Sequence, residues 1–181
     1  ICIDVPADLS IPAAKLAADS VTTSKMLDAN TTAPKLDGAT ISQSDALMNL
    51  ALTASVAANA LTIAVKTKAL VDATATTPIT IGFRNATLAT GDYVQRTITG
   101  ALSLTISSGS TLGTVSGVGK YLYVYLIDNA GTVELAVSGN SIFPDGSLQT
   151  STAEGGVGGA DNATTLYSTT ARTTKAVRLV G

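Results

Sequence analysis

The chain has 181 residues, of which 45% are hydrophobic and only 13% are charged, against roughly 25% in typical globular proteins. Its formal net charge is −2 and its pI is about 4.9, so the basic surface that binds nucleic acid or anionic membrane is missing. Such sparse charge suits a protein that buries surface against copies of itself. Because histidine is absent and Cys2 is the single cysteine, Cys/His zinc sites and Ser-His-Asp or Cys-His catalysis are excluded. We therefore expect no enzyme activity, no metal and no cofactor.

The first ten residues read ICIDVPADLS and lack the basic and apolar regions of a signal peptide. Ile1, Ile3 and Val5 alternate like a strand that could add to a partner sheet, so residues 1–10 are a candidate docking arm. Nowhere does a run of about 18 apolar residues predict a membrane-spanning helix.

A ten-residue repeat follows, with lysines at Lys15, Lys25 and Lys35. Its three copies read IPAAKLAADS, VTTSKMLDAN and TTAPKLDGAT. Pro12, Pro34 and the many threonines argue against a continuous helix. Since a unit this short cannot bury its apolar side chains alone, stacked neighbours or several chains around one axis must cover them.

The apolar residues of the repeat recur about five positions apart and are expected to face the axis of a thin shaft, with the lysines outside. This predicted shaft core comprises Ile11, Leu16, Val21, Met26, Leu36 and Ile41. A flexible polar linker is the alternative interpretation of the same segment. We predict two domains: a docking arm and shaft over residues 1–43, and a globular domain over 44–181.

Residues 50–65 alternate between apolar and polar side chains on either side of Ala57-Ala58-Asn59-Ala60, a pattern that predicts a hairpin. A helix over 46–58 is the competing interpretation, because Leu47, Leu50 and Ala54 also fit helical spacing. The Thr, Ser and Asn content favours strands.

Further strands are predicted over 79–84, 92–99, 102–106, 120–127, 132–137 and 176–180. The segment YLYVYLIDNAGTVELAV is the clearest unit, since two apolar-rich strands flank Asp-Asn-Ala-Gly. Many short strands separated by turn residues predict an antiparallel β-sandwich of the jelly-roll kind. The predicted fold class is thus all-β, an extended shaft followed by this sandwich.

Three sequence features have the residue types of chemical sites. Asp145, Glu154 and Asp161 could in principle supply a carboxylate pair for glycoside hydrolysis, although acidic residues in a Gly-rich stretch usually cap turns. SGVGKY departs from the phosphate-binding loop, because Tyr121 follows the lysine where Ser or Thr is needed. GGVGG at 155–159 lacks the flanking strand and helix of a dinucleotide site and favours a loop.

Tyr121, Tyr123 and Tyr125 fall on one face of the strand predicted over 120–127. A tyrosine stripe can form a core or subunit interface, or it can be a ligand platform on which sugars stack. The core or interface is the favoured interpretation.

The repeat blocks AAKLAADSVTTSKMLDANTTAPKL resemble the repeats of tailed-bacteriophage fibre proteins. ITIGFRNATLATGDY, SLTISSGSTLGTVSG, YLYVYLIDNAGTVELAVSG and TTLYSTTARTTKAVRLVG resemble a distal domain that follows such repeats in phage structural proteins. The resemblance implies a virion structural protein that forms a homotrimer and is attached to tail or capsid. It supplies no catalytic residues.

We therefore expect a trimeric tail fibre in the virion, with a C-terminal domain that binds the host surface. Its expected partners are two further copies of itself, other virion proteins at the N-terminal end, and a host-surface glycan. A capsid decoration or head fibre is the main alternative, and a polysaccharide-cleaving fibre tip is a second.

Overall fold

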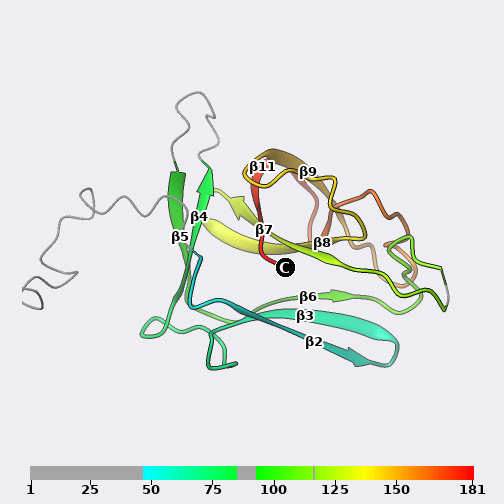
Figure 1. Cartoon of the computed structure of the whole chain (residues 1–181), viewed down its shortest axis with the longest axis horizontal. Coiled ribbons are helices and arrows are strands. Elements are labelled where there is room, and N and C mark those ends of the chain that lie inside the picture. The colour runs from blue at the N-terminus through cyan, green and yellow to red at the C-terminus, as the bar shows by residue number, and fades with distance from the viewer. Residues whose placement is uncertain (1–46, 85–92, 116) are drawn as a thin grey trace, which may run out of the picture. The chain divides into compact units, whose positions relative to one another are not determined.

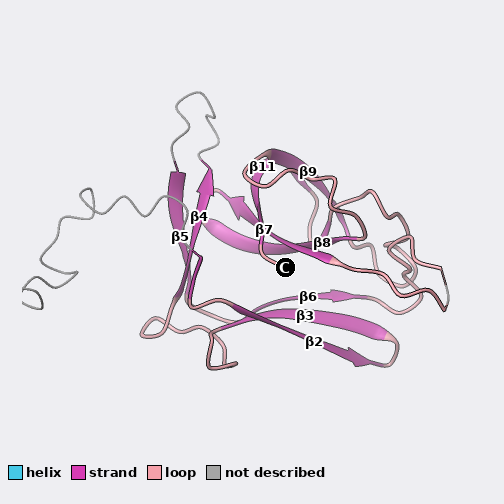
Figure 2. Cartoon of the chain, in the orientation of Figure 1, coloured by secondary structure: helices cyan, strands magenta, loops and turns pink. Residues whose placement is uncertain are grey.

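The computed structural model describes residues 47–84, 93–115 and 117–181. Figure 2 shows that this part of the chain consists of strands and loops without a helix. The predicted shaft, the docking arm and the boundary at residue 43 lie outside the described residues. The all-β prediction is confirmed for the part described, and its sheets are almost entirely antiparallel. The strands are β1 (Leu47–Met48), β2 (Ala51–Ala57), β3 (Ala60–Lys66), β4 (Ile79–Arg84), β5 (Tyr93–Ile98), β6 (Leu102–Ile106), β7 (Tyr123–Asn129), β8 (Thr132–Ser138), β9 (Leu148–Ala153), β10 (Tyr167–Ser168) and β11 (Arg172–Leu179).

Two hairpins form where the sequence predicts them. β2 and β3 pair from Ala51 with Lys66 to Ala57 with Ala60, so the helical alternative for 46–58 is wrong. Ala58 and Asn59 join them with φ of 49° and 61°, the pair of positive φ angles that a tight two-residue hairpin turn requires. Between β7 and β8, the turn residues Ala130 and Gly131 likewise have φ of 52° and 101°.

The strands form three sheets. Five strands close into a barrel in the order β10-β8-β7-β11-β9, in which β9 and β10 pair in parallel. The other two sheets, β1-β4-β5 and β2-β3-β6, have three strands each. In Figure 1 the β2-β3-β6 sheet lies across from β7 and β8, while β4 and β5 stand at one end of the barrel. The sequence patterns predicted neither the closure of a sheet nor a parallel pair.

The core has two parts, one on each face of β7. Leu126 belongs to a large cluster that includes Ile63 and Leu104 from the β2-β3-β6 sheet. Tyr125 and Ile127 point the other way, into the barrel, where they pack in a second cluster with Val177 and Leu166. Because both faces of β7 are buried, its sequence YVYLI is continuously apolar rather than alternating.

Candidate functional site

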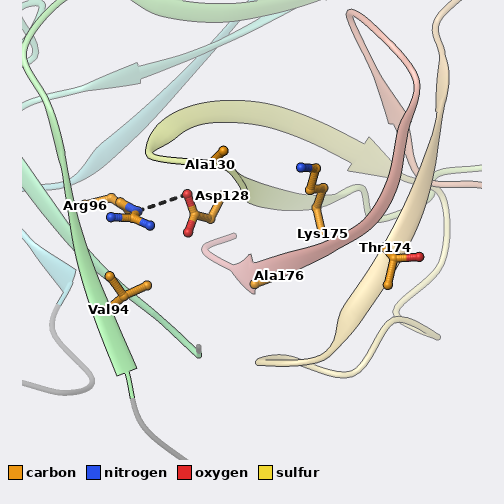
Figure 3. Close-up of a pocket in the computed structure, with 7 residues that line it drawn as sticks. All are labelled: Val94, Arg96, Asp128, Ala130, Thr174, Lys175 and Ala176. Carbon is orange, nitrogen blue, oxygen red and sulfur yellow. Dashed lines mark hydrogen bonds and ion pairs between the residues drawn. The ribbon is translucent and has the colours of Figure 1, made fainter. Parts of the chain in front are cut away.

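An open cavity of about 440 Å³ lies between β5, the β7–β8 turn and β11. Its volume falls within the range of small-molecule sites in proteins. Figure 3 shows its lining, in which two cationic side chains stand on either side of one carboxylate. We call it the Arg96–Lys175 cavity; its lining residues are Val94, Arg96, Asp128, Ala130, Thr174, Lys175 and Ala176.

The alternation of β5 brings Arg96 to the cavity. Along YVQRTI, Val94, Arg96 and Ile98 are half-buried or buried, whereas the intervening residues are exposed. Side chains two apart share a face of a strand, so Arg96 lies on the same inward face as its two apolar neighbours. There its Nε donates a hydrogen bond to Asp128 Oδ1 at 3.0 Å.

Asp128 is held by the turn that follows β7. Its Oδ1 also accepts a hydrogen bond from the amide of Gly131 at 2.8 Å, and its side chain is only 10% exposed. Within the described part of the chain, the second oxygen, Oδ2, accepts no hydrogen bond. The carboxylate is therefore fixed through one oxygen, and the other keeps its capacity to accept a hydrogen bond.

A β-bulge in β11 shapes the opposite wall. The pairing with β9 shifts by one residue between Arg172, opposite Ser151, and Lys175, opposite Gln149. Thr174, within the bulge, has φ of 52°, a conformation that β-branched residues rarely adopt. Residues three apart normally lie on opposite faces of a strand, and the extra residue brings Arg172 and Lys175 to the same face.

Arg172 and Glu134 form a two-pronged ion pair beside the cavity. Arg172 Nε and Nη2 donate to the two Glu134 oxygens, each at 2.6 Å. The hydrogen bonds from Arg172 hold the pKa of Glu134 below its usual range, against the effect of burial. Asn129, which donates to Glu134 Oε1 at 3.0 Å, and the charge of Lys175 act in the same direction.

Glu134→Gln should reduce the dependence of stability on acid pH. Because folding lowers the pKa of Glu134, the unfolded state binds more protons, and the stabilisation is present above the ordinary glutamate pKa and lost as pH falls through the lower folded value. Urea unfolding from pH 7 to pH 3 should show the wild type losing more stability than Glu134→Gln, so that the two curves converge at acid pH. Curves that stay parallel would contradict the assignment.

The three tyrosines singled out in the sequence do not share one environment. Tyr125 is fully buried, and its ring meets Phe143 edge-on, with centroids 5.9 Å apart. Burial, and after it the charges of Tyr123 and Asp145, raise the pKa of Tyr125. Tyr123 is half-buried beside the same cluster, whereas Tyr121 is 84% exposed and precedes β7, which begins later than predicted.

Asp145, Glu154 and Asp161, the candidate carboxylates for glycoside hydrolysis, each accept hydrogen bonds from backbone amides. Glu154 accepts from Ser107 at 2.6 Å and Gly156 at 2.9 Å. Burial acts to raise the pKa of Glu154, but these two bonds outweigh it and leave the pKa lowered. Asp161 accepts from Thr111 at 2.8 Å, and Asp145 from Leu179 at 2.8 Å. All three carboxylates therefore have a structural role, because their hydrogen bonds to backbone amides hold loops in place.

The cavity residues were not singled out by sequence reasoning. One signal was present, since Arg96 alternates in phase with Val94 and Ile98 in a chain with few charges. The predicted shaft core and docking arm, from Ile1 to Ile41, lie outside the described residues. In the described ranges, no group of three or more His, Cys, Asp or Glu residues is placed to hold a metal ion.

The described ranges likewise contain no helix with the length and apolarity of a membrane span. No protein-family model, curated protein or solved structure matches the chain.

Proposed function

We propose that the chain is a non-enzymatic virion structural protein, a trimeric phage tail fibre whose C-terminal β domain binds the host surface. The observation that carries this proposal is the ten-residue repeat, in which apolar residues recur about five positions apart from Ile11 to Ile41, except at Thr31. In a single chain these side chains would remain in water. Three chains wound about one axis would bury them and leave the lysines outside.

Apolar surface at the beginning of the β domain supports the assembly. Leu47 and Met48 are 41% and 48% exposed and follow the proposed shaft in the chain. The turn after β3 carries Leu70 and Val71, exposed by 62% and 56%. Asn49 Oδ1 accepts a hydrogen bond from the Lys68 amide at 3.2 Å, which ties this turn to the segment after β1. Copies that meet at the end of a shaft would cover such a surface.

Mass photometry of the full chain should give three times the monomer mass of 18.1 kDa. The variant Leu70→Asp places a charge on the apolar surface and should shift the trimer towards monomer on dilution. The matched control is Val157→Asp, which changes a residue that is 82% exposed in the Gly-rich loop and should leave the mass unchanged. A stable, folded wild-type monomer at micromolar concentration would overturn the proposal.

A capsid decoration or head fibre would use the same trimeric shaft. Labelling the protein on the virion separates the two, because the label falls on the tail in one case and on the capsid shell in the other. The polysaccharide-cleaving alternative has less support, since Asp145, Glu154 and Asp161 all fasten loops. It requires reducing ends to appear from host capsular polysaccharide and to disappear with Glu154→Gln.

A further inference from the structure

We propose that the Arg96–Lys175 cavity binds a sugar that carries a carboxylate group, such as a hexuronic acid. The sugar carboxylate would be held by the two cations, and a sugar hydroxyl would donate to Asp128. The inference rests on the proposed function for the biological source of the sugar, a glycan on the host surface. Binding itself is measurable on the isolated protein.

The charges of the cavity favour an anion. Arg96 and Lys175 stand on opposite sides of Asp128, as Figure 3 shows, so the cavity residues carry one net positive charge. The neighbouring Arg172 and Glu134 neutralise each other through their two hydrogen bonds. The whole chain has a formal net charge of −2, so this local balance is opposite in sign to that of the protein.

Both cations retain donors for a ligand. Arg96 uses its Nε on Asp128, and its two terminal nitrogens form no hydrogen bond with any residue that the structure describes. The Lys175 ammonium likewise has no hydrogen-bond partner among the described residues. A guanidinium offers paired donors that match the geometry of a carboxylate, and an ammonium adds a point charge.

Asp128 favours a hydroxylated ligand over a bare anion. Asp128 lines a cavity of about 440 Å³, and its Oδ2 accepts no hydrogen bond from a described residue. A simple anion would leave this acceptor without a donor, whereas a sugar hydroxyl would donate to it. Val94, Ala130 and Ala176 supply the apolar wall against which a sugar ring could lie.

The lining residues of the cavity are preorganised for a ligand. Asp128 is fixed by Arg96 and Gly131, and the bulge in β11 sets the direction of Lys175. Thr174, in its strained conformation, lies in the same wall. Bulges and strained residues are concentrated near ligand sites, and fixed walls lower the entropy lost on binding.

The test is a calorimetric titration of the full chain with glucuronate at low salt. A ligand of this size should bind with a Kd on the order of 1 mM, and added salt should weaken the binding. Lys175→Gln should raise the Kd about tenfold, as expected from the loss of one charge-assisted hydrogen bond. Lys68→Gln removes the same charge from an exposed residue outside the cavity and should bind like the wild type.

Two further ligands separate the parts of the proposal. Glucose tests the role of the charge and acetate tests the role of the hydroxyls, so each should bind at least about tenfold more weakly than glucuronate. Glucose or acetate binding as tightly as glucuronate, no effect of Lys175→Gln, or no binding of glucuronate at tens of millimolar would overturn the assignment. The mass of the assembly, measured on the same samples, reports on the fibre proposal separately. Thermal unfolding of Lys175→Gln checks that the variant is folded.

Discussion

Replacing Tyr125 with alanine is expected to lower the free energy of unfolding by about 4 kcal/mol, the usual cost of deleting a buried aromatic ring. Tyr125 is fully buried and packs with Ile127 and Val177 inside the barrel. Its edge-on contact with Phe143 would also be lost. Urea unfolding followed by circular dichroism measures the change.

Two control variants test whether the loss of stability in Tyr125→Ala comes from the packing of its ring rather than from its hydroxyl group. Tyr121→Ala alters a side chain that is 84% exposed, so it should change stability by less than about 0.5 kcal/mol. Tyr125→Phe keeps the ring and removes a hydroxyl whose hydrogen bond to the Phe143 carbonyl is long, 3.4 Å, so the loss should be about 1 kcal/mol or less. If Tyr125→Ala unfolded as the wild type does, Tyr125 would not be part of the barrel core.

Gly113→Ala is expected to cost about 3 kcal/mol, from two causes that add. Gly113 has φ of 67°, where an alanine is strained by about 1–2 kcal/mol. A Cβ there would also lie 2.5 Å from the amide nitrogen of Ala163 and 2.6 Å from its Cβ, so one of the two loops would have to move. The same unfolding experiment measures the loss.

Gly117→Ala is the matched control for the close contact. Gly117 has φ of 78°, but a Cβ there would meet no atom within 4 Å. Only the conformational strain should remain, about 1–2 kcal/mol. Equal losses in the two variants would mean that the loop carrying Ala163 does not press on Gly113.

Local patterns predicted the strands whose two faces differ or whose ends carry turn residues. β6 has the bounds expected from the sequence, and β5 differs from its predicted range by one residue at each end. β9 and β10 were missed because their polar sequences, LQTSTA and YS, carry no apolar alternation. The hydroxyl groups of their buried serines, Ser151 and Ser168, form a hydrogen bond with each other at 2.6 Å. Because the two serines are 17 residues apart, no pattern of neighbouring residues predicts that they pair.

The sequence by itself determined that this domain is all-β and placed its two tight hairpin turns, because period-two alternation and positive-φ turns are properties of neighbouring residues. Tertiary structure alone decided the closure of the barrel and the composition of the cavity. Arg96 and Asp128 are 32 residues apart, and Lys175 comes from a third strand. The bulge that turns Lys175 and Arg172 to one face depends on pairing with β9, which no spacing within β11 specifies.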